Sequence, residues 1–215
     1  MRIMCLHANL NNAKIIDQGL HDLEVDFVHV VDDRLIEMIR QHETEAAILL
    51  RVQKQVERLL KQKPDFILIT CTNYILFLDK LEISSSIPIL KIDELLFSQL
   101  PDSDTIVQLL FTNQETVAGT VARFQSLYPS VETNVRLIEK AFDHYLAGDI
   151  RTHDLQISQA LAATTVESQL VAAQLSMSPA VEIFNQSQTR NMLHPLDGLR
   201  KYFSETLRNY NEQSK

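Results

Sequence analysis

The residue of this sequence best placed to do chemistry is Cys71, which follows an apolar run within the segment 66–74, FILITCTNY. The run predicts a strand buried on both faces, and Thr72 or Asn73 can cap a helix that follows it. Cys71 would then lie at a helix N-terminus, which favours anions and can lower the pKa of a thiol. The alternative is a buried, unreactive cysteine, which Cys71 taken alone favours because free cysteine is among the most often buried residues.

Further polar residues follow the first apolar segment. His7 ends the strand predicted at 3–6, where its imidazole could donate a proton or bind a carboxylate; a structural histidine is about equally well supported. Asn9, in the next turn, could orient a ligand or support the turn. Cys5 lies inside the strand and is most simply a core residue. The remaining histidines show no metal-ligand spacing along the chain, so we expect no metal site.

Apolar strands alternate with amphipathic helices along the chain, which predicts an α/β fold with mainly parallel sheets flanked by helices. The acidic pair Asp32 and Asp33 ends one strand and is expected to cap the next helix. Gly148 is expected to end a helix as its C-cap. The predicted strands are 3–6, 25–31, 66–69, 87–92, 106–111, 169–173 and 181–184, and the predicted helices include 43–63, 115–127, 135–146, 154–164 and 196–210.

A polar turn cluster at 101–104, PDSD, is the best candidate for a domain boundary. We therefore expect two similar lobes. The expected divisions are a first α/β lobe at 1–101 carrying Cys71, a second α/β lobe at 102–195 carrying Gln174, and a C-terminal helix at 196–215 packing back on the first lobe.

The two halves also have similar internal spacing. The interval from His7 to Cys71 is nearly the same as that from Thr112 to Gln174. Two similar lobes would place Cys71 and Gln174 at matching strand ends. A small ligand could then be held in a cleft between the lobes, with a helix N-terminus of each lobe pointing at it.

The composition excludes several classes of partner. A net charge of -8 argues against binding nucleic acid, which requires clustered Lys and Arg. Two cysteines without a CxxC pattern indicate a reducing compartment, with no disulfide framework and no thiolate zinc site. No segment is apolar enough for a signal peptide or a membrane span. We expect a cytoplasmic protein with no membrane partner, and we leave open whether it is a monomer or a homodimer.

Three motifs follow one another in a characteristic order: ITCTNY at 69–74, LFTNQETVAGT at 110–120 and AQLSM at 173–177. Together they resemble the cofactor-independent aspartate/glutamate racemase superfamily, which also contains hydantoin racemases, arylmalonate decarboxylases and maleate isomerases. The resemblance covers nearly the whole chain. It implies two similar lobes with the ligand cleft between them, a small carboxylate or amino-acid ligand, and no cofactor.

In that superfamily two cysteines flank the substrate α-carbon, and one removes its proton while the other delivers a proton to the opposite face. The resemblance implies that Cys71 is the first of these groups and places Gln174 at the position of the second. Because glutamine cannot deliver a proton, ordinary two-thiol racemisation is in doubt. The ligand-binding residues that the resemblance implies, each of which could instead be a cap or turn residue, are His7, Asn9, Thr72, Asn73, Thr112, Asn113, Thr116, Gln174 and Ser176.

The sequence therefore predicts an enzyme that acts on a small carboxylic or amino acid, with Cys71 as base, proton donor or nucleophile. A racemase, an isomerase and a decarboxylase are all compatible with one thiol, because a decarboxylase needs only one proton delivered to an enolate. The alternative is a non-catalytic carboxylate-binding protein that has lost the two-thiol mechanism.

Overall fold

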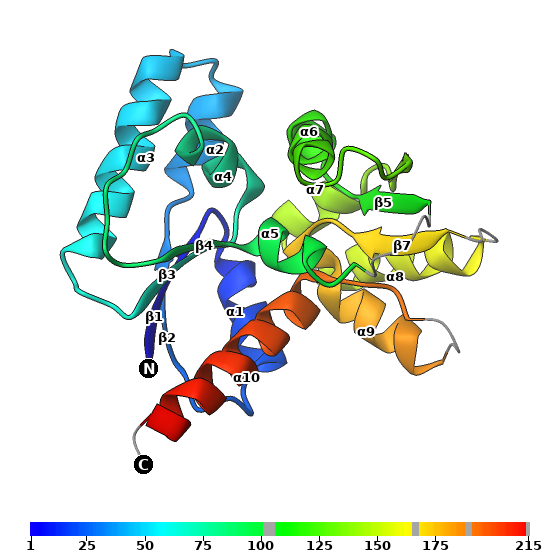
Figure 1. The fold of residues 1–215 in the computed structure, drawn as a ribbon. Coiled ribbons are helices and arrows are strands. Elements are labelled where there is room, and N and C mark those ends of the chain that lie inside the picture. The colour runs from blue at the N-terminus through cyan, green and yellow to red at the C-terminus, as the bar shows by residue number, and fades with distance from the viewer. Residues whose placement is uncertain (101–105, 165–167, 188–190, 214–215) are drawn as a thin grey trace. The chain divides into compact units, whose positions relative to one another are not determined.

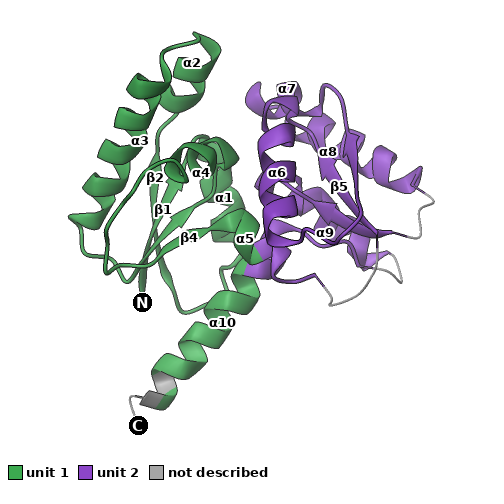
Figure 2. Cartoon of the chain, turned by 45° about the horizontal axis from the view of Figure 1, so that its top comes forward, with its two compact units in different colours: residues 1–95, 199–215 green, residues 96–198 purple. Residues whose placement is uncertain are grey.

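The computed structural model describes residues 1–100, 106–164, 168–187 and 191–213 and divides the chain into two compact units (Figures 1 and 2). Unit 1 comprises residues 1–95 and 199–215, and unit 2 comprises residues 96–198. The boundary predicted at 101–104 lies outside the described residues. The units divide between Leu95 and Leu96, because Leu96 and Phe97 pack in the core of unit 2.

Unit 1 is built on a sheet of four parallel strands in the order β2-β1-β3-β4. The central strands are apolar and almost wholly buried, as expected where helices cover both faces of a parallel sheet. The short strand after Pro88 lies at the sheet edge, where a proline is tolerated. The strands are β1 (Arg2–His7), β2 (Asp26–Val31), β3 (Phe66–Ile69) and β4 (Ile89–Lys91).

The helices of unit 1 bury apolar stripes against this sheet. In α3 (Glu45–Leu60), the Thr44 side chain accepts a hydrogen bond from the Ala47 backbone N–H and so caps the N-terminus of the helix. The C-terminal helix buries Phe203, whose ring packs edge-on against those of Phe27 and Phe66. The helices that begin in or reach into unit 1 are α1 (Leu10–Gly19), α2 (Arg34–Arg40), α3 (Glu45–Leu60), α4 (Thr72–Leu78), α5 (Ile92–Phe97) and α10 (Pro195–Gln213).

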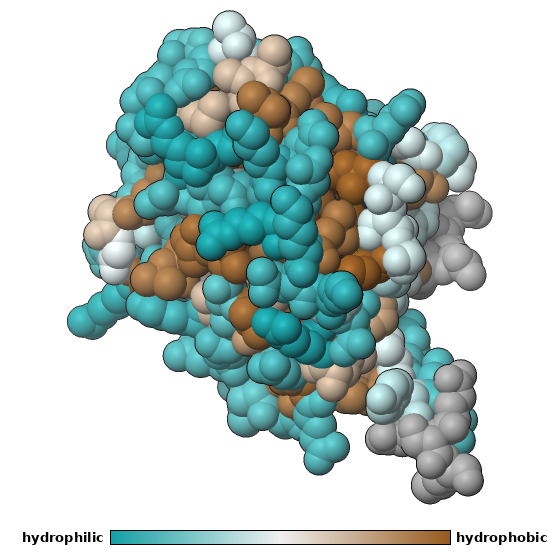
Figure 3. Space-filling model, turned by 90° about the vertical axis from the view of Figure 1, so that its left-hand side faces the viewer, coloured by the Kyte–Doolittle hydropathy of each residue, from teal (hydrophilic) through white to brown (hydrophobic). Residues whose placement is uncertain are grey.

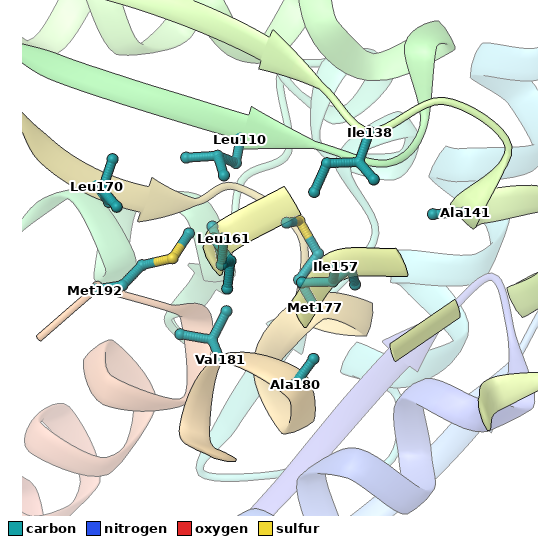
Figure 4. Close-up of a cluster of buried hydrophobic side chains, with 11 residues drawn as sticks. Leu110, Ile138, Ala141, Ile157, Leu161, Leu170, Met177, Ala180, Val181 and Met192 are labelled. Atoms are coloured by element: carbon teal, nitrogen blue, oxygen red, sulfur yellow. The ribbon is translucent and has the colours of Figure 1, made fainter. Parts of the chain in front are cut away.

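Unit 2 has a smaller parallel sheet in the order β6-β5-β7. One face of it packs on a cluster of buried aliphatic and methionine side chains from the strands and helices, including Leu110, Ile157 and Val181 (Figure 4). The elements are β5 (Val107–Phe111), the 3-10 turn η1 (Gln114–Thr116), α6 (Val117–Leu127), β6 (Thr133–Leu137), α7 (Ala141–Leu146), α8 (Ile150–Ala162), β7 (Gln169–Ala172), the 3-10 turn η2 (Leu175–Met177) and α9 (Ser178–Gln186).

The predicted fold class is confirmed: both units are parallel sheets flanked by helices. Two element predictions were wrong. The helix predicted over 135–146 is instead strand β6 followed by α7, because the segment 133–137 alternates polar and apolar residues at the strand period. The strand predicted at 181–184 is part of α9, whose first turn contains Pro179. Gly148 ends α7 in the left-handed conformation, at φ 79°, as predicted.

The face shown in Figure 3 is largely hydrophilic, with hydrophobic side chains visible between the polar ones. Among the residues that the structure describes, no helix combines the length and the hydropathy needed to cross a membrane.

Candidate functional site

Cys71 lies where β3 gives way to α4, at the N-cap position of that helix. Its backbone is extended, with φ -105° and ψ 122°, and its side chain is half-buried. Burial raises the pKa of the Cys71 thiol, the backbone N–H groups of Tyr74 and Asn73 act in the opposite direction, and the Asp32 carboxylate raises it further. The expectation that the helix N-terminus lowers this pKa is therefore wrong, because desolvation outweighs the N–H groups.

A buried ion pair holds the elements around Cys71 together. The Tyr74 hydroxyl in α4 donates to Asp32, which lies just beyond β2 and is 4% exposed. Arg51 in α3 donates to the same carboxylate from Nε at 2.8 Å and also from Nη2. The capping role predicted for the acidic pair is not observed. The Asp32 carboxylate accepts hydrogen bonds from Tyr74 and Arg51 instead. Asp33 occupies the N-cap position of α2, but its side chain makes no capping hydrogen bond.

His7 lies at the end of β1 and is fully buried. Its Nδ1 is 2.7 Å from Thr70 Oγ1, and its Nε2 is 2.8 Å from His29 Nδ1. Burial lowers the pKa of His7 to about 3, and the nearby His29 lowers it in the same direction. His7 therefore does not supply a proton near neutral pH, contrary to one of the two predicted roles.

The remaining predicted residues of unit 1 are at helix starts. Asn9 is the N-cap of α1, where its Oδ1 accepts a 2.8 Å hydrogen bond from the Asn11 backbone N–H, so it supports the turn. Thr72 is half-buried at the first position of α4, and Asn73 is buried beside it. The structure thus brings Thr72 and Asn73 next to Cys71 by chain connectivity.

In unit 2, the side chain of Gln174 organises the predicted polar residues. Its Oε1 accepts three hydrogen bonds: from the backbone N–H of Thr112 at 2.6 Å, the Thr112 hydroxyl at 2.8 Å and the backbone N–H of Asn113 at 3.0 Å. Its Nε2 donates to Thr116 Oγ1 at 2.9 Å. Of the side chains that were predicted to bind a ligand carboxylate, the Thr112 hydroxyl donates to Gln174.

The other side chains of this region are arranged around that core. Thr116 donates from its hydroxyl to the Asn113 backbone carbonyl at 3.1 Å. The Asn113 side chain caps η1 by accepting from the Glu115 backbone N–H. Ser176 is buried within η2, directly after Gln174 and Leu175.

The pairing of the strands shows which positions of the two units are equivalent. The Thr70 N–H donates to the Leu6 carbonyl in unit 1, and the Ala173 N–H donates to the Leu110 carbonyl in unit 2. Cys71 and Gln174, each one residue further on, therefore stand at matching positions. Since Leu6 matches Leu110, Thr112 corresponds to Ala8, one residue beyond the position that the sequence spacing suggested.

Motif spacing along the sequence did not reveal one cluster of potential metal ligands. Cys5, His7 and His29 each offer a ligand atom within 4.8 Å of those of the other two. Cys5 and His29 are register partners on the adjacent strands β1 and β2. Motif spacing along the sequence cannot show which residues pair across two strands. The only signal in the sequence was that Cys5 and His7 are two residues apart in a predicted strand and so share one of its faces.

No family model matches this sequence, and no curated protein is similar to it in sequence. Solved structures do match. They include the Picrophilus torridus aspartate racemase, with 14% identity over 95% of this chain and 93% of that chain and a TM-score of 0.74. The glutamate racemase from Francisella tularensis subsp. tularensis SCHU S4, in complex with D-glutamate, has 13% identity over 98% of this chain and 81% of that chain, with a TM-score of 0.71.

The allantoin racemase from Pseudomonas fluorescens has 12% identity over 97% of this chain and 91% of that chain, with a TM-score of 0.59. At such identities a structural likeness shows the fold alone. The chain has the α/β fold of these racemases, as the resemblance implied.

Proposed function

We propose that this chain is a racemase-superfamily enzyme that acts on a small carboxylic or amino acid without a cofactor, with Cys71 as its proton-transferring group. The observation that carries the proposal is the position of Cys71: a half-buried thiol at the carboxyl end of β3, within a fold shared with aspartate, glutamate and allantoin racemases. The carboxyl ends of parallel strands are where open α/β folds bind their ligands.

The protonation state of Cys71 favours one role. Because burial raises its pKa, the thiol carries its proton at neutral pH. A protonated thiol can deliver its proton to an enolate or carbanion, which is a far stronger base than a thiolate. We therefore assign Cys71 as a proton donor, as decarboxylation or isomerisation of a small acid requires.

Racemisation by two opposed thiols is not part of the proposal. Gln174 stands at the position matching Cys71, and its amide does not ionise. Its oxygen and nitrogen make four hydrogen bonds within unit 2. His7 cannot replace the second acid, because both of its ring nitrogens are engaged and burial lowers its pKa to about 3.

The proposed ligand is a small carboxylate. D-glutamate is the ligand of the Francisella tularensis protein and is the first probe for this chain. Thr72 and the backbone amides after Cys71 are proposed to bind the carboxylate, since hydrogen bonds from fixed N–H groups stabilise the charge that develops in an enolate. The expectation that the ligand lies in a cleft between the two lobes stays a prediction.

The test is proton NMR in D₂O with the purified chain and a panel of small acids: D- and L-glutamate, D- and L-aspartate, maleate and a substituted malonate. We expect the substituted malonate to lose CO₂ with deuterium incorporation, because a protonated thiol delivers a proton and does not remove one. Cys71→Ala and Cys71→Ser should both stop this reaction, because neither side chain carries a thiol. Turnover that persists in both folded variants would remove Cys71 from the mechanism.

A second candidate is a carboxylate-binding protein without turnover. The closed hydrogen-bond network of Gln174 favours it, since the matching position of unit 2 contributes no acid or base. Calorimetric titration separates the two: a binder takes up its ligand equally well in the wild type and in Cys71→Ser, and no solvent deuterium enters the ligand.

We also propose a cytoplasmic location. Both cysteines, Cys5 and Cys71, are free thiols, and thiols persist in reducing compartments. Fractionation of cells that produce the full chain, with a disulfide-bonded periplasmic or secreted marker as the control, tests this.

A further inference from the structure

Three metal-ligating side chains converge on one face of the unit 1 sheet. Cys5 and His7 are two residues apart in β1 and therefore point to the same face. His29 in β2 is the parallel register partner of Cys5. One ligand atom of each residue lies within 4.8 Å of those of the other two. Cys5 and His7 are fully buried, and the His29 side chain is 17% exposed.

The hydrogen bonds of His7 depend on its tautomer. The Thr70 hydroxyl lies 3.1 Å from the Leu6 backbone carbonyl and 2.7 Å from His7 Nδ1. When it donates its single proton to Leu6, it accepts from His7 Nδ1. A neutral His7 that carries its proton on Nδ1 has a lone pair on Nε2. That lone pair points at His29 Nδ1, 2.8 Å away.

The hydrogen bonds of His29 are fixed from its other side. Its Nε2 lies 2.9 Å from Asp17 Oδ1, and an ionised carboxylate only accepts, so this nitrogen carries a proton. A neutral His29 would then have its lone pair on Nδ1, directed at the lone pair of His7. Two lone pairs 2.8 Å apart repel each other. In this tautomer the contact takes a cation between the two lone pairs, either a second proton or a metal ion; in the other tautomer Thr70 donates to His7 Nδ1, and His7 Nε2 donates to His29 Nδ1.

We propose that Cys5, His7 and His29 bind a zinc ion. A thiolate and two imidazoles are typical zinc ligands, and the fourth tetrahedral position is left for water. In a tetrahedral site with bonds near 2.0 Å the two ring nitrogens stand about 3.3 Å apart, so a shift of roughly half an ångström accommodates the ion.

The surroundings of the cluster match those of a metal site. Each histidine donates its other ring N–H to an oxygen, His7 to Thr70 and His29 to Asp17, an arrangement that orients ligating imidazoles and raises their basicity. The charges also balance: a dication, the Cys5 thiolate and the Asp17 carboxylate sum to zero. A neutral sum lowers the cost of placing the ion in a buried position.

Zinc binding breaks the S–H bond of Cys5 and forms a Zn–S bond, and the thiol proton leaves to solvent. A His29 that is doubly protonated in the metal-free protein releases its Nδ1 proton as well. The ion would join β1 to β2 at the strand end next to Thr70 and Cys71. The inference does not depend on the proposed function, because none of its ligands takes part in the proposed reaction.

The experiment is a titration of the reduced, metal-stripped full chain with CoCl₂, whose absorption reports its ligands. We expect one equivalent to bind, with a thiolate-to-cobalt charge-transfer band, and ZnCl₂ to displace it. Cys5→Ala should abolish the band. Asp17→Asn, which replaces the charged acceptor of His29 by a neutral one without touching a ligand, should weaken cobalt binding by roughly 10- to 100-fold.

Two matched variants serve as controls. Cys71→Ala removes the other cysteine, and His21→Gln removes an exposed histidine outside the cluster; both should keep the band and the affinity. Circular dichroism establishes that each variant is folded. If Cys5→Ala fails to fold, His29→Gln at its half-buried position replaces it, with loss of stoichiometric binding as the expected result.

The inference is overturned if the wild type takes up no stoichiometric cobalt or zinc at micromolar concentration. It is also overturned if the band survives in Cys5→Ala or disappears in Cys71→Ala. In those cases a proton alone joins the two rings.

Discussion

The carboxyl ends of the two sheets have the same backbone plan but differ in what fills them. In each unit an asparagine caps the turn after the first strand, Asn9 in unit 1 and Asn113 in unit 2. The matching third-strand position holds Cys71 in unit 1 and Gln174 in unit 2. Cys71 leaves a half-buried thiol at this position, whereas the longer Gln174 reaches back to the turn and makes four hydrogen bonds there.

The difference shows how one residue can give a strand end a structural role. The carbonyl oxygen of Gln174 occupies backbone and hydroxyl donors of unit 2, at a position that is 9% exposed. These hydrogen bonds add stability because buried N–H groups are satisfied. The proposed chemistry belongs to unit 1, and unit 2 has the more saturated network.

The strongest test of this comparison is the removal of the thiol. Cys71→Ala is expected to lower any turnover by at least about 100-fold, because a positioned proton donor contributes on the order of 10²- to 10⁴-fold. The free energy of unfolding should fall by only about 1 kcal/mol, the usual scale of a point substitution. Paired kinetics and urea denaturation measure both quantities. A large loss of stability with turnover retained would reverse the roles given to the two units.

Removal of the Gln174 side chain is expected to affect mainly the stability of the fold. Gln174→Ala leaves the buried N–H groups of Thr112 and Asn113 without their acceptor, which should lower the free energy of unfolding by about 2–4 kcal/mol. Gln186→Ala, at an exposed position at the end of α9, is the control and should change it by less than about 0.5 kcal/mol. Equal effects of the two substitutions in urea denaturation would show that the network of Gln174 adds nothing.

The pH dependence of thiol labelling sharpens the assignment of Cys71 as a proton donor. Burial raises the pKa of this thiol, so its thiolate fraction, and with it the rate of reaction with iodoacetamide, should rise about tenfold per pH unit and still be rising at pH 9. Mass spectrometry should find the label on Cys71, with the fully buried Cys5 unreacted. A rate that levels off below pH 8 would indicate a depressed pKa and a thiolate base instead.

The smallest expected effect is a gain of function in unit 2. Gln174→Cys shortens the side chain, frees the Thr112 and Asn113 amides and places a second thiol at the position that matches Cys71. Slow inversion of glutamate or aspartate is the expected result, measured by chiral chromatography after incubation in D₂O. The unmodified chain is the reference and should retain configuration. Fast inversion by that reference would mean that a group other than Gln174 supplies the second proton.

Much of the framework was predictable because its determinants are local. The apolar run before Cys71 predicts a buried strand, and the small polar residues after it predict the start of a helix; both are observed as β3 and α4. The segment 133–137 was misread because Val135 also fits the apolar spacing of the helix that follows it. The period of the apolar pattern alone does not distinguish a strand from a helix in elements this short.

The sequence by itself determined the α/β alternation, the position of Cys71 at a strand end and the absence of a proton-bearing group at Gln174, because each depends on residue type and near neighbours. Only the tertiary structure decided what those residues contact. Gln174 meets Thr112, 62 residues away, because β5 and β7 pair in parallel, and Cys5 meets His29 because β1 and β2 do. Burial of the same strand ends raised the pKa of Cys71 and lowered that of His7, since desolvation depends on how the whole unit packs and not on local sequence.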